Sequence, residues 1–341
     1  MISSSQLIEI SNAFLRGMNL EAKNIEIIDA GLINRTWKVM DTAGGNHILQ
    51  QVNTAVFPNP KIILTNMIVV AKVLEQSAYP GALLRPYPLQ GRANKKDVDD
   101  SWRMIPFVED AISYQKVSNP VLARNAAELL AAFHHALSKI ETSRLQNPLP
   151  EFLNFNKRLD DYGSAKKEGQ SERLSTANKT IASIDANLSI IEAFIELYNS
   201  QDVQVIHGDP KISNFLFNRE GAVLALIDWD TIMPGSVLYD LGDMARSMCN
   251  KSTEDDNKAT NVFDRQVYDE LLIGYNQSSI GKALSSSNFA LAAKAITLIQ
   301  SVRFLTDFLQ GDKYYHVSHA AQNLHRANNQ LALFLAMKTS L

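Results

Sequence analysis

The stretch VIHGDPKISNFLF, from Val205 to Phe217, places a histidine, a glycine, an aspartate and an asparagine between two apolar runs. Asp209 precedes Asn214 by five residues, and a second acidic group closes the apolar run ALIDWD, at Asp228 and Asp230. Carboxylate and amide oxygens are the hard ligands that suit Mg²⁺. The two stretches together predict a polar, chemically active loop beside a short strand hairpin.

The bulk composition is that of an ordinary globular protein. The chain has 341 residues, of which 45% are hydrophobic and 20% charged, with a formal net charge of -3. This balance excludes whole-chain disorder. It also lacks the basic surplus of most nucleic-acid binders, so we expect no nucleic-acid partner.

One cysteine, Cys249, excludes a disulfide within the chain and fits a reducing compartment. Its helix-like neighbours favour a buried structural thiol over a reactive one. The N-terminal stretch has an amphipathic helix pattern without the basic start and apolar block of a signal peptide. No run of about 18 apolar residues is present, so we expect a cytoplasmic protein with no membrane span.

The chain changes character near residue 119, and no internal repeat is found. Before that point, strands are predicted over 25–31, 35–45, 46–53 and 101–110, with a Gly-Gly hairpin turn and one helix over 59–78. After it, helical patterns dominate, apart from two short strands within 214–230. The polar residues 156–183 predict a solvated helical pair or a flexible excursion. The class is α+β, with a small β-rich lobe before a larger, mainly helical one.

The order of the polar residues resembles the C-lobe signature of kinase-like phosphotransferases. Gly208 stands where protein kinases have Arg, and Asp-Trp-Asp replaces Asp-Phe-Gly. The pattern HGDxxxxN…IDWD…YDLGD instead resembles the aminoglycoside phosphotransferase and choline kinase family. The resemblance implies a protein-kinase-like two-lobe fold, with a nucleotide-binding lobe over 1–108 and a catalytic, substrate-binding lobe over 109–341. It also implies ATP and Mg²⁺ as cofactors.

Six further stretches are similar to the N-acetylhexosamine 1-kinase branch of that family. They are GLINRTWKV, HILQQVNTAVFPNP, WRMIPFVE, HGDPKISNFLF, LIDWDTIMPG and RFLTDFLQGDKYY. This closer resemblance implies a small-molecule partner, an amino sugar, whose anomeric hydroxyl receives the ATP γ-phosphate. GlcNAc and GalNAc are the expected acceptors.

The resemblance assigns roles in the C-lobe residue by residue. Asp209 is the expected base that engages the acceptor hydroxyl, and Lys211 lies where it can touch the phosphoryl group in transfer. Asn214 and Asp228 are the expected Mg²⁺ ligands. Asp230 is expected near the substrate as a further acid of the metal shell. The alternative is that Asp230 supports its own loop. His207 is expected to bond to backbone, and Asp240 and Asp243 are expected to brace the catalytic loop.

The N-lobe departs from the family pattern in two places. Gln50 occupies the strand position at which kinase-like lobes usually carry a Lys or Arg for the α- and β-phosphates. The glycine-rich loop contains only Gly31, so backbone amides over 31–36, with Asn34 and Arg35, are expected to cover the phosphates. Adenine is expected against the connector at Pro106, Phe107 and Val108, which is also the expected hinge.

The acceptor wall is predicted from the stretch QSVRFLTDFLQGDKYY. Arg303 is the candidate polar contact, although an ion pair with Asp307 one helical turn later is the competing interpretation. Tyr314 or Tyr315 is expected to stack on a sugar face. Trp229 lies between two acids and is either a second sugar-facing aromatic or part of the core.

The remaining polar motifs favour structural roles. His134 and His135 lie on a predicted helix, and His47 is expected on a strand surface. No Cys/His grouping has zinc spacing, and no Gly-x-Ser-x-Gly nucleophile motif is present.

Three alternatives to an N-acetylhexosamine kinase stay open at the level of sequence. The first is a kinase for another small molecule, such as an aminoglycoside, choline, homoserine or a different sugar. The second, suggested by Gln50 and the short glycine loop, is a catalytically weak kinase-like binding protein. The third is a metal-dependent phosphohydrolase built on the same acids. The oligomeric state is not predicted.

Overall fold

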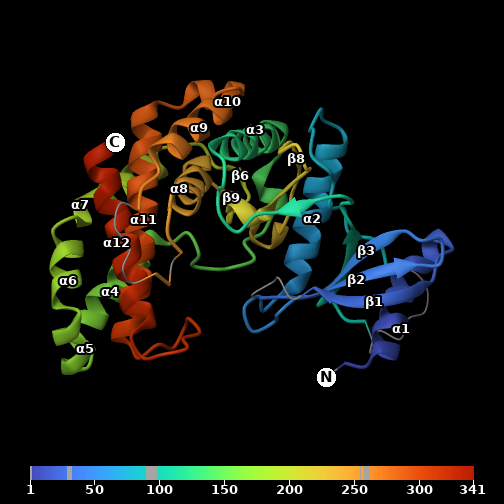
Figure 1. Ribbon diagram of the computed structural model, residues 1–341, viewed down its shortest axis with the longest axis horizontal. Coiled ribbons are helices and arrows are strands. Elements are labelled where there is room, and N and C mark those ends of the chain that lie inside the picture. Colours follow the sequence, from blue (N-terminus) through green and yellow to red (C-terminus); the bar gives the residue numbers. More distant parts are fainter. Residues whose placement is uncertain (1, 29–32, 90–97, 254, 257–261) are drawn as a thin grey trace.

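The computed structural model describes residues 2–28, 33–89, 98–253, 255–256 and 262–341. Figure 1 shows a small sheet at one end of the molecule, a larger group of helices at the other, and helix α2 between them. This arrangement confirms the α+β class with a small β-rich lobe and a larger helical lobe. The predicted division at residue 108 stays a prediction, and Gly31 lies outside the described residues.

The N-terminal sheet is antiparallel, with the described strands in the order β1-β2-β3-β4. They are β1 (Ala22–Ile28), β2 (Arg35–Asp41), β3 (Asn46–Gln51) and β4 (Trp102–Pro106). The predicted hairpin joins β2 to β3, and its turn contains Gly44 at a φ of +88°, a value that favours glycine. The register sets Gln50 opposite Thr36 on one side and opposite Arg103 on the other.

Two helices flank this sheet. The first, α1 (Ser4–Leu15), starts with a Ser3–Gln6 capping box and packs its apolar stripe on a sheet face that includes Trp37 and Trp102. The second, α2 (Pro60–Glu75), begins at a proline. Its buried Asn66 donates to the carbonyls of Gln146, at 2.7 Å, and Ile232, at 2.9 Å. Because both acceptors belong to the helical lobe, α2 ties the sheet to that lobe.

The helical lobe contains short strands and longer helices. The strands are β5 (Ile112–Ser113), β6 (Gln204–Ile206), β7 (Phe215–Phe217), β8 (Val223–Leu226) and β9 (Met233–Gly235). The helices are α3 (Pro120–Leu137), α4 (Phe155–Glu168), α5 (Ser171–Thr176), α6 (Asn178–Asp185), α7 (Leu188–Asn199), α8 (Val237–Met248), α9 (Arg265–Tyr275), α10 (Ser279–Ala283), α11 (Ser286–Leu309) and α12 (Gln322–Ser340). One apolar core joins α2, α3, β7, β8 and α9, so the two lobes share buried packing.

Helix α11 is long and apolar enough to cross a membrane by length and composition alone. However, 78% of its most apolar window is buried inside the protein. It packs against α4, α7, α8 and α12, and its buried Ser301 hydroxyl donates to the carbonyl of Ala327 on α12. These contacts make α11 the central helix of the lobe.

Two sequence-based expectations need comment. The segment over 156–183 is helical, but it forms the three helices α4, α5 and α6 rather than the predicted pair. It is also not fully solvated, because Tyr162 and Ala165 of α4 are buried in an apolar cluster with residues of α11. The prediction that His47 lies on a strand surface is wrong. Its ring is only 7% exposed and is held between the Asp41 carboxylate, at 2.9 Å, and the Tyr87 hydroxyl, at 3.0 Å.

We predict that Cys249 resists thiol reagents in the folded protein. Its side chain has no exposed surface, and burial, with smaller effects of Asp264 and Asp269, raises the pKa of the thiol. The thiolate is the reactive form, so dithionitrobenzoate should react only at the rate of unfolding. Stopped-flow labelling with and without urea measures this. Rapid labelling of the native chain would contradict the buried position.

Candidate active site

The loop from the end of β6 to the start of β7 is held by one buried carboxylate, that of Asp240 at the start of α8. Asp240 has no exposed surface and accepts hydrogen bonds from the backbone N–H groups of His207, at 2.7 Å, and Gly208, at 2.8 Å. It also contacts His134 Nε2 at 2.9 Å. The sequence-based role of Asp240 as a brace is confirmed. Asp243 instead pairs with Arg246 on its own helix.

Gly208 gives this loop its sharp turn. Its φ is +86°, and a Cβ placed there would lie 2.6 Å from the carbonyl oxygen of Thr231. The Thr231 hydroxyl in turn donates to the His207 carbonyl at 2.8 Å. The close approach brings the Asp209 loop against the segment that carries Asp228.

His207 bonds to backbone, as predicted. Burial is the main cause that lowers the pKa of its imidazole, so the ring is neutral at physiological pH. Its Nε2 lies 2.9 Å from the Ile227 carbonyl and its Nδ1 lies 3.3 Å from the Asp209 N–H. A neutral ring with a proton on Nε2 satisfies both contacts. The ring therefore joins the two loops.

Asp209, Lys211 and Asn214 meet at one point. Lys211 Nζ lies 2.7 Å from Asp209 Oδ2, and Asn214 Nδ2 donates to the Asp209 carbonyl at 2.8 Å and to its Oδ2 at 3.2 Å. Burial opposes the charged form of Lys211, but Asp209, with smaller effects of Asp228 and Asp243, raises its pKa overall. The loop thus holds a carboxylate whose position is fixed by two donors.

Asp228 stands at the end of the second loop with a φ of 65°, in the left-handed region. Burial, followed by the charges of Asp230 and Asp209, raises the pKa of its carboxyl to about 7. The negative charges of Asp230 and Asp209 that raise this pKa would also favour a cation bound at Asp228. The donor set therefore fits Mg²⁺.

The predicted ligands Asn214 and Asp228 supply only part of a Mg²⁺ coordination shell. Oxygens from other groups would have to complete it. Among the described residues, no group of three or more His, Cys, Asp or Glu side chains is arranged to hold a metal. Mg²⁺ commonly takes one or two protein ligands and completes its shell with phosphate and water. Because Asn214 Nδ2 is engaged with Asp209, its Oδ1 is the atom that would hold the ion.

Asp230 is buried and already paired, which disagrees with its prediction as a substrate contact. It is 2% exposed, forms an ion pair with Arg103 of β4, and accepts a hydrogen bond from Asn34 Nδ2. The alternative prediction, that Asp230 supports its loop, agrees with these contacts. Asn34 Oδ1 also accepts from the Asn53 N–H at 2.9 Å, so Asn34 connects the sheet to the helical lobe.

Arg103 is the site-facing residue that the sequence analysis missed. Its guanidinium Nε donates to Gln50 Oε1 at 2.9 Å, and Gln50 Nε2 donates to the Thr36 hydroxyl at 3.3 Å. The signal in the sequence is a single arginine inside the apolar strand SWRMIPF. A buried charge in such a run requires a partner of opposite charge.

Trp229 belongs to the core, so its prediction as a sugar-facing aromatic is wrong. Its side chain is 1% exposed, packs near Phe133 at a ring distance of 6.2 Å, and donates from Nε1 to the Leu226 carbonyl at 2.7 Å. A fully buried ring has no surface left for a substrate.

Arg303 on α11 is not paired with Asp307. The Asp307 carboxylate instead accepts the backbone N–H groups over 313–315, at 2.8–2.9 Å, and so shapes the loop after α11. The Arg303 guanidinium lies near the rings of Tyr315, at 5.8 Å, and Phe152, at 6.0 Å. Tyr314 is 72% exposed beside it, which leaves its ring accessible.

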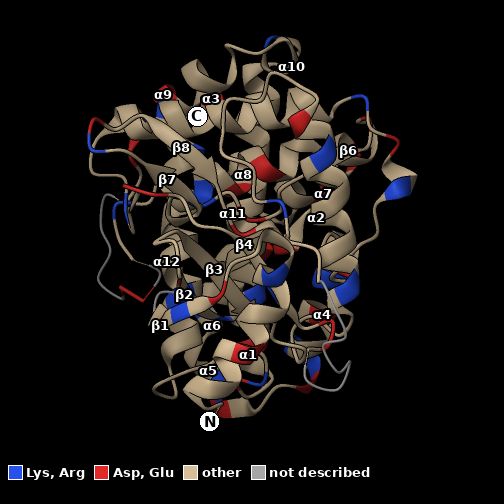
Figure 2. Cartoon of the chain, turned by 90° about the vertical axis from the view of Figure 1, so that its right-hand side faces the viewer, with Lys and Arg blue, Asp and Glu red and all other residues tan. Residues whose placement is uncertain are grey.

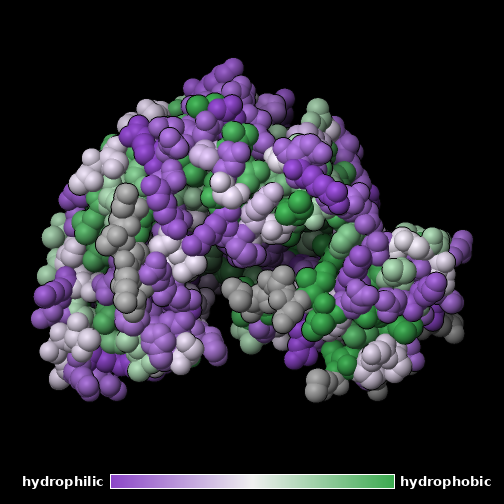
Figure 3. All heavy atoms as spheres, viewed as in Figure 1, coloured by the Kyte–Doolittle hydropathy of each residue, from purple (hydrophilic) through white to green (hydrophobic). Residues whose placement is uncertain are grey.

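The connector expected to hold adenine follows β4. Pro106 ends the strand opposite His47, and the Phe107 ring lies 4.7 Å from Lys38 Nζ. Val108 packs on the shared core. Proline has no N–H, so Pro106 can contribute only its carbonyl to a base. Figure 3 shows the surface hollowed between the two lobes.

Comparison with known families decides the class of the chain. Residues 24–272 match the family model described as "Phosphotransferase enzyme family". The chain belongs to this family. As a member, it is an ATP-dependent kinase of a small molecule that carries a hydroxyl group. The matched range contains the HGD loop and the IDWD loop, but ends before α11.

Solved structures share the protein-kinase-like fold, which confirms that prediction. Spectinomycin phosphotransferase, in complex with ADP and spectinomycin, is 13% identical, with a TM-score of 0.62 over 99% of each chain. Choline kinase LicA from Streptococcus pneumoniae is 16% identical, with a TM-score of 0.59 over 96% of this chain and 99% of that one. Amicoumacin kinase hAmiN, in complex with AMP-PNP, Ca²⁺ and Ami, is 12% identical, with a TM-score of 0.62 over 98% and 93%. At these identities the likeness concerns the fold.

We predict that Gly208→Ala destabilises the protein more than Gly44→Ala. Both glycines have a positive φ, but only at Gly208 does a Cβ meet backbone, 2.6 Å away, whereas Gly44 has nothing within 4 Å. Gly44→Ala should lower the free energy of unfolding by about 1 kcal/mol, and Gly208→Ala by about 3 kcal/mol or more because overpacking adds to it. Urea titrations compare the two. Equal losses would contradict the close approach of the loops.

Proposed function

We propose that this enzyme transfers the γ-phosphate of ATP, with Mg²⁺, to the anomeric hydroxyl of an N-acetylhexosamine such as GlcNAc or GalNAc. The observation that carries the transfer is the Asp209 carboxylate, fixed by Lys211 and Asn214 beside Asp228. The stretches similar to the N-acetylhexosamine 1-kinase branch support the acceptor. A reducing, cytoplasmic location stays a proposal, supported by the single buried cysteine.

The chain contributes position and charge to this reaction. Asp209 orients the acceptor hydroxyl and takes its proton, while Lys211, already 2.7 Å from Asp209, stabilises negative charge as the phosphoryl group moves. Asn214 and Asp228 would hold Mg²⁺, which neutralises charge on the nucleotide phosphates. Asp240 keeps the base in place through its two backbone hydrogen bonds.

The acceptor wall is basic and aromatic, which supports a neutral or anionic acceptor over a cationic one. Burial, followed by the negative charge of Asp243, raises the pKa of the Tyr239 hydroxyl, whereas the positive charges of Arg303 and Arg246 lower it. The Arg303 guanidinium itself lies 5.8 Å from the Tyr315 ring and 6.0 Å from the Phe152 ring. Arg158 is a further cation in this region. Burial and, after it, the positive charge of Arg303 lower the pKa of Arg158.

This charge pattern bears on the other acceptors. Choline and aminoglycosides carry positive charge and need acidic or aromatic contacts. Arg303 forms no ion pair with a carboxylate among the residues that the structure describes. In the cartoon of Figure 2, the positions of Asp and Glu are interspersed with those of Lys and Arg along the chain.

We predict that Asp209→Asn reduces kcat by about 100-fold or more, the range expected for loss of a general base. The amide has nearly the same shape, so nucleotide binding should persist. Asp269→Asn is the matched control, because Asp269 forms an exposed pair with Arg265 on α9. ADP release by both variants measures the effect. Wild-type turnover by Asp209→Asn would exclude the proposed mechanism.

We predict that an N-acetylated sugar is the best acceptor. The panel comprises GlcNAc, GalNAc, glucose, galactose, choline, homoserine and kanamycin, assayed by ADP release with Mg-ATP. Phosphorus NMR of the product should show a phosphate coupled to an anomeric proton. ADP release with choline or kanamycin alone would replace the proposed acceptor. Release of inorganic phosphate without any acceptor would favour a phosphohydrolase, and nucleotide binding without turnover would favour a binding protein.

A further inference from the structure

Arg103 is a buried cation in the middle of an apolar strand. Its side chain is 4% exposed, and its strand neighbours Trp102, Met104 and Ile105 are buried as well. Taking a guanidinium out of water is costly unless its donors are paired. The partners of Arg103 therefore indicate which parts of the protein its positive charge holds together.

These partners come from both lobes. The guanidinium pairs with Asp230 of the helical lobe, donates to Gln50 Oε1 on β3 at 2.9 Å, and reaches Met67 Sδ on α2 at 3.4 Å. Asn34 donates to the same Asp230 carboxylate. We call Asn34, Gln50, Arg103 and Asp230 the cross-lobe cluster. Arg103 is its positive charge and Asp230 its negative charge.

The cluster lies between the two halves of the proposed nucleotide site. Gln50 is the position at which a kinase-like sheet carries its cation, and Arg103 is its direct partner across the β3–β4 register. Asp230 follows the proposed metal ligand Asp228 by two residues, in the single turn over Trp229–Thr231. A change at Arg103 is therefore transmitted to both the sheet and the metal-holding loop.

We propose that Arg103 is a positioning residue, which supplies from β4 the fixed positive charge that β3 lacks and, through Asp230, aligns the Asp228 loop with the sheet. The inference rests on the proposed nucleotide site. An arginine suits this role because its planar group bonds Gln50 and Asp230 at once, whereas an ammonium group is a single point charge.

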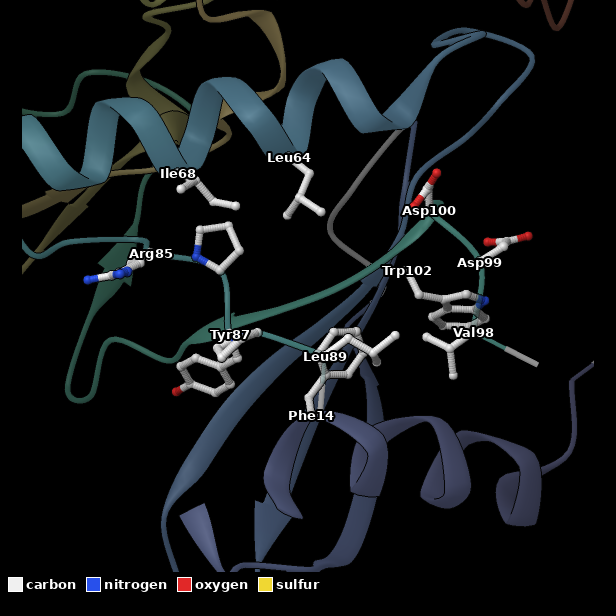
Figure 4. A pocket seen from close by; sticks show the side chains of 12 residues that line it. Phe14, Leu64, Ile68, Arg85, Tyr87, Leu89, Val98, Asp99, Asp100 and Trp102 are labelled. Carbon is white, nitrogen blue, oxygen red and sulfur yellow. The ribbon is translucent and has the colours of Figure 1, made fainter. Parts of the chain in front are cut away.

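A cavity on the other face of the sheet does not account for Arg103. It has a volume of about 320 Å³ and is lined by Phe14, Leu64, Ile68 and Trp102, among others (Figure 4). Successive residues of a strand point to opposite faces. Trp102 faces this cavity, so Arg103 faces the site.

The test compares Arg103→Met with wild type in two measurements. Calorimetry with Mg-AMP-PNP gives the Kd of the nucleotide, and ADP release at saturating ATP gives the Mg²⁺ concentration for half-maximal rate. Both should rise about tenfold or more in Arg103→Met, because the phosphates lose a fixed positive charge and the Asp228 loop is no longer aligned with the sheet through Asp230. Adding Gln50→Lys to Arg103→Met should restore part of the loss, because residue 50 lies opposite residue 103 in the β3–β4 register and the new ammonium group returns a positive charge to the cluster.

The control for a purely structural effect is Asp41→Asn. Asp41 and His47 form a pair of similar burial in the same sheet, so this variant should lower the unfolding midpoint without changing either constant. If Arg103→Met does not fold, Asp230→Asn removes the pair from the other side and should raise the same constants. Unchanged constants in a folded variant, or equal changes in Asp41→Asn, would overturn the inference. Failure of the wild type to bind Mg-AMP-PNP would instead refute the proposed nucleotide site.

Discussion

The buried carboxylate of Asp240 is the constraint on which the candidate active site depends. It accepts two backbone N–H groups from the HGD loop and contacts His134, which in turn bonds the Tyr275 hydroxyl. A charge with no exposed surface is tolerated only when donors surround it. The position of Asp209 thus follows from helices α3, α8 and α9, which are distant in the sequence.

A second buried charge, that of Arg103, links this arrangement to the N-terminal sheet. Asp240 orders the helical side of the site, and the Arg103–Asp230 pair connects that side to β3 and β4. The Asn66 contacts from α2 and the shared apolar core act at the same boundary. The relative position of the two lobes is therefore fixed by a few polar contacts that lie within a shared apolar core.

In the proposed acceptor site, the side chains rather than the fold decide which acceptor can bind. Similar folds occur in kinases whose names refer to choline, spectinomycin and amicoumacin. In this chain, the Arg303 guanidinium lies 5.8 Å from the Tyr315 ring and 6.0 Å from the Phe152 ring, and burial, followed by the positive charge of Arg303, lowers the pKa of Arg158. Fold alone does not fix a substrate, so the charge of this proposed wall is the feature by which we propose to distinguish the acceptors.

The sequence by itself determined the class, the β2–β3 hairpin and the order of Asp209, Asn214 and Asp228, because local patterns and short motifs encode these. Only the tertiary structure decided the places of Trp229, His47, Arg303 and Arg103. Each depends on partners 30 or more residues away or on another strand, as in the Arg103–Asp230 pair. Burial and ion pairing are properties of the assembled chain, and no local pattern specifies which charge meets which.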